Sequence, residues 1–143
     1  MSHVPAPTLA RSYAGDTATL QAARRDVVDL LDRIEASAEL IERAALVVTE
    51  LAANAVEAAP GRAYRVEVTV AAGVVVMCVR NHTTNGGVPP PRNAWRAPDA
   101  SAARGRGLPI IASLTDEAEV RRVDDDTVEV QVRLRFVARA TTR

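Results

Sequence analysis

The spacing of the apolar residues changes at the pair Pro60-Gly61, and this change constrains the fold more than any other feature of the chain. Before the pair, apolar residues recur every three or four positions, which is typical of amphipathic helices. After it, apolar and polar residues alternate, which is typical of half-buried strands. Two helices followed by a run of strands predict an α+β domain. We expect a two-layer sandwich whose helices cover one face of a mixed, mostly antiparallel sheet.

Local signals indicate where the individual elements begin and end. Asp16 is a suitable N-cap for a first helix and Ser37 for a second, which ends before Pro60-Gly61. The apolar run VVVMCV, 74–79, suits a central strand that is covered on both faces. The other expected elements are strands over 8–14, 64–70, 117–123 and 127–137 and a short helix over 108–114. We expect one domain over 8–137, preceded by a flexible arm at 1–7 and followed by a tail at 138–143.

Composition excludes several classes of function. All 18 basic residues are arginine, which rules out a catalytic lysine, a Schiff base and a Walker-type phosphate lysine. The formal net charge of zero and the 3% aromatic content give no reason to expect nucleic-acid binding. The single cysteine, Cys78, excludes an internal disulfide and is expected to be a buried, inert thiol. Since no apolar run approaches about 18 residues and no signal-peptide pattern is present, we expect a cytoplasmic protein that does not enter a membrane.

The helical segment VVTELAANAVEAA carries two polar residues one turn apart in an apolar stretch. Glu50 and Asn54 share a helix face, although asparagine is a poorer helix former than the alanines around it. With Glu39, Arg43 and Glu57 they form a polar stripe opposite the apolar one. A solvated outer face is one explanation of this stripe. A site that needs a carboxylate and an amide is the other.

Two further segments place polar or flexible residues at the ends of apolar elements. In SAARGRGLPII, Gly105 and Gly107 precede a short helix, and the N–H groups at the start of a helix favour phosphate. The alternative is that the two glycines only form a turn.

Asn81 follows the apolar strand. It either forms a hydrogen bond to the edge of a ligand or only starts a turn. Between these points, over about 82–105, no periodicity is present. So long a connection in a compact domain is often a functional lid.

In this order and spacing, the three segments resemble the ATP-binding domain of the GHKL (Bergerat-fold) superfamily. More narrowly, they resemble the small anti-sigma-factor serine/threonine kinases and their actinobacterial regulatory relatives. TELAANAV is similar to the N-box helix, VVVMCVRN to the strand that enters the first glycine box, and RGRGLPII to the second glycine box. The resemblance covers almost the whole chain, from Thr8 to Val137, and it implies the Bergerat ATP-binding fold.

The resemblance also implies a role for particular residues. Asn54 corresponds to the N-box asparagine that holds Mg²⁺ against the nucleotide phosphates, for which an amide oxygen is a suitable hard ligand. Glu50 corresponds to the general base that takes a proton from the attacking hydroxyl or water. The segment 82–105 corresponds to the ATP lid. The residues expected to contact the nucleotide are Asn54, Asn81, Arg104, Gly105, Arg106, Gly107 and Leu108.

Two residues depart from the family pattern. Asn81 stands where relatives have an aspartate that accepts a hydrogen bond from the adenine amino group, and the glycines that usually follow are displaced to 86–87. Ala58 stands where relatives often have a basic residue that meets phosphate. Both changes predict weaker nucleotide binding, because a charge-assisted hydrogen bond is stronger than a neutral one.

The functional prediction therefore has two forms. The favoured one is an ATP- and Mg²⁺-binding, anti-sigma-factor-like regulator that phosphorylates serine or threonine of an anti-anti-sigma (STAS-type) partner protein. The alternative is a module of the same fold that regulates transcription by protein–protein contact without turning over ATP. Both forms predict a sigma factor or its antagonist as the partner. The resemblance also implies a homodimer, since relatives of this kind commonly form one.

Overall fold

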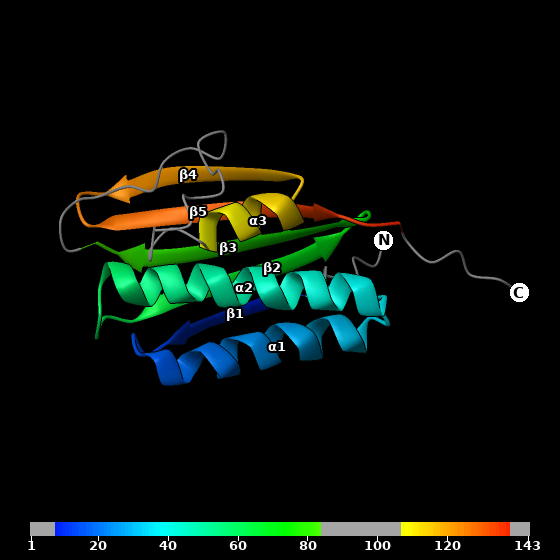
Figure 1. Ribbon diagram of the computed structural model, residues 1–143, viewed down its shortest axis with the longest axis horizontal. Coiled ribbons are helices and arrows are strands. Elements are labelled where there is room, and N and C mark those ends of the chain that lie inside the picture. Colours follow the sequence, from blue (N-terminus) through cyan, green and yellow to red (C-terminus); the bar gives the residue numbers. More distant parts are fainter. Residues whose placement is uncertain (1–7, 84–106, 138–143) are drawn as a thin grey trace, which may run out of the picture.

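In the part of the chain that the structure describes, residues 8–83 and 107–137, five strands form one sheet and three α-helices lie on one face of it (Figure 1). The structure is a computed structural model. The strand order across the sheet is β1 (Thr8–Tyr13), β2 (Tyr64–Ala71), β3 (Val74–His82), β5 (Thr127–Arg135) and β4 (Glu117–Asp124). Every pairing between these strands is antiparallel. The arrangement confirms the predicted two-layer α+β sandwich.

The helix boundaries follow the local signals in the sequence. The helical elements are a 3₁₀ turn at Thr17–Thr19, α1 at Leu20–Arg33, α2 at Ala38–Ala58 and α3 at Gly107–Leu114. Asp16 caps the 3₁₀ turn by accepting a hydrogen bond from the N–H of Ala18, and Ser37 caps α2 by accepting one from Leu40. Beyond α2 the chain turns at Gly61, whose φ of +84° lies in the left-handed region that glycine tolerates. None of the described helices is both long and apolar enough to cross a membrane.

The hydrophobic core lies between the helices and one face of the sheet. In β3, Val75, Met77 and Val79 face the helices and are fully buried. The residues that alternate with them, such as Val76 and Cys78, are only half-buried on the opposite face. The prediction that this strand is covered on both faces is therefore wrong. The described helices all lie on one side of the sheet, so the continuous valine run reflects strand preference as well as burial (Figure 1).

Cys78 is half-buried, where the sequence predicted full burial. Desolvation of the thiol, with the nearby carboxylates of Glu129 and Glu67, raises its pKa to about 11. The thiol is therefore protonated at neutral pH. A protonated thiol is a poor nucleophile, in agreement with the prediction of an inert cysteine.

A polar cluster ties α1 to the edge strand β1. The Tyr13 hydroxyl donates a 2.6 Å hydrogen bond to the Asp26 carboxylate on α1, and Arg11 donates to the same carboxylate at 2.9 Å. The Tyr13 ring stacks on Tyr64 of β2, with ring centres 5.5 Å apart. Partial burial raises the pKa of Asp26, but the hydrogen bonds from Tyr13 and Arg11 outweigh it and hold this pKa below its usual value. The cluster stabilises the position of the first helix on the sheet.

Candidate functional site

Glu50 and Asn54 lie one turn apart on α2, and both side chains are partly exposed. They share their helix face with Arg43, because seven residues complete almost two turns of an α-helix. Neither the Glu50 nor the Asn54 side chain forms a hydrogen bond or an ion pair with any residue in the described ranges. Both side chains therefore keep their polar atoms available for a ligand.

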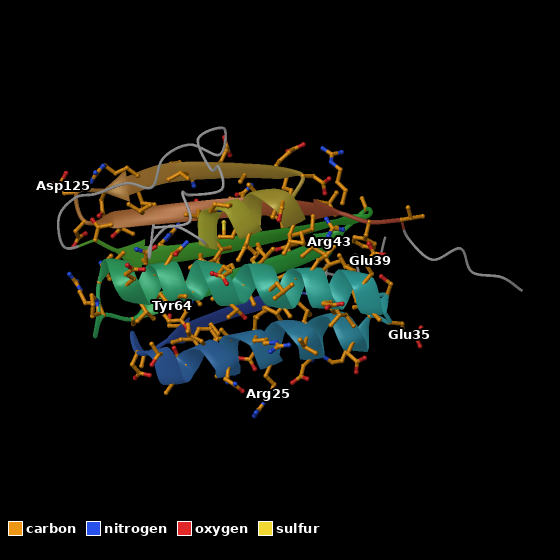
Figure 2. The ribbon with its side chains drawn as sticks, viewed as in Figure 1. Arg25, Glu35, Glu39, Arg43, Tyr64 and Asp125 are labelled. Atoms are coloured by element: carbon orange, nitrogen blue, oxygen red, sulfur yellow. The ribbon has the colours of Figure 1, made fainter. Side chains whose placement is uncertain are left out.

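Arg43 shows which element this face of α2 adjoins. Its guanidinium donates a 3.0 Å hydrogen bond to the carbonyl of Leu114, the last residue of α3, and Figure 2 shows Arg43 on the α3 side of α2. The two helices pack together and run in opposite directions (Figure 1). Since the C-terminus of α3 lies beside Arg43, its N-terminus at Gly107 lies toward the later turns of α2, where Glu50 and Asn54 are.

The N-terminus of α3 adds a phosphate-binding element to this region. A helix N-terminus has unpaired N–H groups and a partial positive charge, and glycine at the first position lets a ligand approach the backbone closely. Gly107 and Leu108 form the first residues of α3. The other residues predicted to line the phosphates, Arg104, Gly105 and Arg106, lie outside the described residues, as does most of the predicted lid.

Asn81 lies near the end of β3 on the helix-covered face of the sheet, because it alternates in step with Met77 and Val79. Its Nδ2 donates a 2.8 Å hydrogen bond to the carbonyl of His82. This bond orients the amide so that Oδ1 remains available as an acceptor. Asn81 is partly buried, as expected of a residue at the edge of a ligand site.

The predicted residues Glu50, Asn54, Asn81 and Gly107 thus lie on one side of the sheet, and their roles in binding and catalysis stay predictions. Arg43 belongs to the polar stripe for which a solvated face and a ligand site were both considered, and it links α2 to the end of α3. The sequence gives no local signal for that contact, since its two residues are far apart in the chain.

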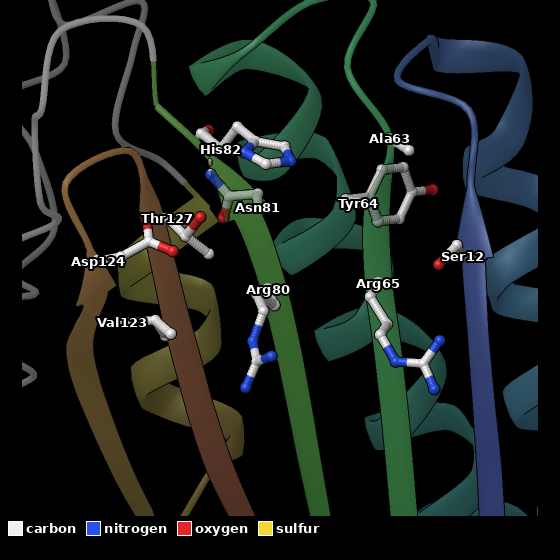
Figure 3. A pocket seen from close by; sticks show the side chains of 10 residues that line it. All are labelled: Ser12, Ala63, Tyr64, Arg65, Arg80, Asn81, His82, Val123, Asp124 and Thr127. Carbon is white, nitrogen blue, oxygen red and sulfur yellow. Dashed lines mark hydrogen bonds between the residues drawn. The ribbon is translucent and has the colours of Figure 1, made fainter.

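A cavity of about 290 Å³ lies at the end of β3, on the face of the sheet opposite the described helices, which we call the uncovered face (Figure 3). Of the group above, Asn81 also lines this cavity, whereas Glu50 and Asn54 do not. Its wall includes Arg80, which donates a 3.0 Å hydrogen bond to Glu129, while Arg121 donates a 2.6 Å bond to the other oxygen of that carboxylate. Glu129 is only 6% exposed. Its burial raises the pKa, but the two arginines hold that pKa below its usual value. Both oxygens of the Glu129 carboxylate are therefore already engaged by arginines, so the helix side remains the stronger candidate site.

Comparison with known proteins gives the family. Residues 13–136 match the model of the histidine kinase-like ATPase domain. The chain therefore belongs to the histidine kinase-like ATPase domain family, which confirms the superfamily recognised from the three motifs. No curated protein matches the chain at a significant level.

Two solved structures have the same fold at low sequence identity. The structure of the RsbU and RsbW domains of Rv1364c from Mycobacterium tuberculosis superposes with a TM-score of 0.65 at 19% identity. That match covers 96% of this chain, which spans about a third (35%) of the Mycobacterium chain. A chain of the SiaB–SiaC complex from Pseudomonas aeruginosa gives a TM-score of 0.65 at 15% identity and is 90% covered, as is this chain. At these identities the likeness establishes the fold alone.

Proposed function

We propose that this chain is an ATP-binding, anti-sigma-factor-like regulator that transfers the γ-phosphoryl group of ATP to a hydroxyl of a partner protein. The observation that carries the proposal is the position of Glu50 and Asn54. Both have side chains without a partner in residues 8–83 and 107–137, on the face of α2 that adjoins the start of α3. An unpaired carboxylate, an amide and a helix N-terminus are the groups that phosphoryl transfer needs.

The side chains present fit a bound Mg²⁺. The Asn54 amide oxygen is a hard ligand of the kind that Mg²⁺ accepts, and this cation is usually bound by few protein groups together with substrate phosphates. Within the described ranges there is no group of three or more histidine, cysteine, aspartate or glutamate residues that could hold a metal alone. When bound, the cation would neutralise the charge of the phosphates.

Glu50 would act as the general base of the transfer. Its carboxylate accepts the proton of the partner's serine or threonine hydroxyl as the hydroxyl oxygen forms a bond to the γ-phosphorus. The bond from that phosphorus to the bridging oxygen of ADP breaks, and ADP leaves. The partner gains a phosphate ester, and Glu50 later returns its proton to solvent. The SiaB–SiaC complex supports a protein as the partner, because a chain of this fold was solved there together with a second protein.

Asn81 and Ala58 favour a second function, a binding module of the same fold that does not turn over ATP. Asn81 offers adenine a neutral amide in place of the aspartate that relatives use, and Ala58, near the end of α2, carries no charge for phosphate. In that case the chain would regulate transcription through contact with a sigma factor or its antagonist. The two candidates differ in a single measurable property, Mg²⁺-dependent ATP binding.

Calorimetric titration of the purified protein with ATP, with and without Mg²⁺, tests the proposal. We expect binding that depends on Mg²⁺ and is at least about tenfold weaker in Asn54→Ala, since a charge-assisted contact contributes about 1.5–3 kcal/mol. Glu42→Ala, an exposed position on another face of α2, serves as the matched control and should bind ATP like the wild type. No binding at millimolar ATP would favour the second function.

A further inference from the structure

Thr83 has a buried hydroxyl that lacks a hydrogen-bond partner. Its residue surface is 8% exposed, and Oγ1 makes no hydrogen bond in the structure of residues 8–83 and 107–137. Buried polar atoms are nearly always paired, and leaving one unpaired costs stability. The other such atom among these residues is Nδ1 of His82, which lies 3.7 Å from the Asp126 carboxylate. Thr83 Oγ1 is therefore the clearer example of a buried polar atom without a partner.

The register of the sheet places this hydroxyl next to Asn81. The N–H of Thr83 donates a 2.8 Å hydrogen bond to the carbonyl of Asp126, so Thr83 extends the β3–β5 ladder by one residue beyond the pair His82–Thr127. Side chains alternate between the faces of a sheet. Thr83 therefore shares the helix-covered face with Asn81, and Thr127 lies with His82 on the other face.

We propose that Thr83 is a specificity-determining residue that donates a hydrogen bond to a ring nitrogen of adenine, while Asn81 Oδ1 accepts one from the neighbouring amino group. This inference rests on the proposed function, ATP binding at the helix side of the sheet. It assigns a ligand to a donor that, among residues 8–83 and 107–137, is buried there without a partner.

The pair reads adenine by its pattern of donors and acceptors. In adenine the amino group, a donor, lies between two ring nitrogens, N1 and N7, that are acceptors. An acceptor from Asn81 beside a donor from Thr83 matches either edge. Guanine has a carbonyl oxygen in place of the amino group. This oxygen and Asn81 Oδ1 are both acceptors, so they could not form a hydrogen bond with each other. Because Asn81 Nδ2 is already bonded to His82, the amide cannot turn to suit guanine without breaking that bond.

The experiment measures the affinity of the wild type and of Thr83→Val for ATP, 1-deaza-ATP and 7-deaza-ATP, all with Mg²⁺. We expect Thr83→Val to weaken ATP binding about tenfold, as for a buried hydrogen bond that loses its donor. We expect the wild type to bind one of the two deaza analogues about tenfold more weakly than ATP, and Thr83→Val to bind that analogue and ATP equally. Thr83→Ser, which keeps the hydroxyl, should restore the preference.

The controls separate a nucleotide contact from a structural role. Thr127→Val removes a hydroxyl that is 7% exposed at the same end of the sheet but on the other face, and it should leave all three affinities unchanged. Without nucleotide, Thr83→Val should melt no lower than the wild type, since it removes an unpaired buried hydroxyl.

The inference is overturned if Thr83→Val weakens ATP and both analogues by the same factor, has no effect on ATP, or lowers the melting temperature of the free protein. If one of these results is found and the wild type still binds ATP, only the role of Thr83 is excluded and the proposed function is retained. A wild type that binds none of the three nucleotides overturns the inference and the proposed function together.

Discussion

Two carboxylates on opposite sides of the sheet, Glu129 on β5 and Glu50 on α2, have different environments. On the uncovered face, Glu129 is almost fully buried and is held by Arg80 and Arg121. On the helix side, Glu50 is partly buried on the face of α2 that adjoins α3, and it pairs with no residue in 8–83 or 107–137. Glu129 is therefore engaged in contacts that stabilise the sheet, whereas Glu50 keeps its carboxylate available for the role proposed above.

The largest expected effect that would test this contrast is at Glu50. Glu50→Gln should slow the conversion of ATP to ADP, with water as acceptor, by about a thousandfold, because general-base catalysis commonly contributes 10²–10⁴. ATP affinity should stay close to that of the wild type, since the amide keeps the size of the side chain. Glu42→Gln is the control on α2. A variant that turns over ATP at the wild-type rate would remove Glu50 from the chemistry.

The second effect is at Glu129, where we expect a loss of stability and no change in ATP affinity. Glu129→Gln leaves Arg80 and Arg121 facing a neutral amide, and it should lower the free energy of unfolding by about 2 kcal/mol, less than for a fully buried pair because both arginines are partly exposed. Urea denaturation measures this. Glu119→Gln, exposed on the neighbouring strand β4, should change it by less than about 0.5 kcal/mol. Equal effects of the two substitutions would contradict the assignment.

A smaller effect, and a pH-dependent one, is expected at Asp26. Its folded pKa lies below the unfolded value of about 3.9, so the ionised carboxylate stabilises the fold above that pH. That contribution is lost as the pH falls through the folded pKa. Asp26→Asn should therefore cost about 1 kcal/mol at pH 7 and progressively less below about pH 4. Unfolding curves from pH 7 to pH 3 would show the two proteins converging; a constant difference would be inconsistent with the shifted pKa.

The smallest effect is expected on the reactivity of Cys78, because the pKa of its thiol depends on the carboxylates near it on the uncovered face. Its pKa of about 11 predicts slow alkylation at pH 7 and a rate that rises with pH toward that value. The carboxylate of Glu129 contributes to the raised pKa, so Glu129→Gln should shift the pH profile of alkylation to lower pH. A profile that is the same in both proteins would mean that Glu129 does not contribute to this pKa.

The sequence predicted those parts of the fold that local patterns determine. Ser37 caps α2 as expected, because an N-cap acts on backbone groups only two or three residues away. Asp16 caps the 3₁₀ turn that directly precedes α1, whereas it was expected to cap the helix itself. The shared face of Glu50 and Asn54 also follows from helical geometry alone. The exposure of one side of β3 could not be predicted in this way, since a run of valines does not show whether a second layer of helices exists.

Contacts that depend on strand order, register or helix packing were not predictable. Glu129 meets Arg80 and Arg121 only because β5 lies between β3 and β4, and strand order cannot be read from one strand's composition. The packing of α3 against α2, seen in the contact between Arg43 and Leu114, joins residues that are far apart in the chain. Thr83 gave no signal, since a threonine after a strand is ordinary until its hydroxyl is found buried and unpaired.

The strand order also has a consequence for the time course of folding. The pairs β2–β3 and β4–β5 join neighbouring segments of the chain and can form as local hairpins, whereas β1–β2 and β3–β5 must each close a long loop. Asn81 and Thr83 lie on the β3–β5 seam, where the two hairpins meet. We therefore expect the edge proposed to read the nucleotide to be assembled late, so that any gain of ATP binding during refolding lags the formation of hairpin structure.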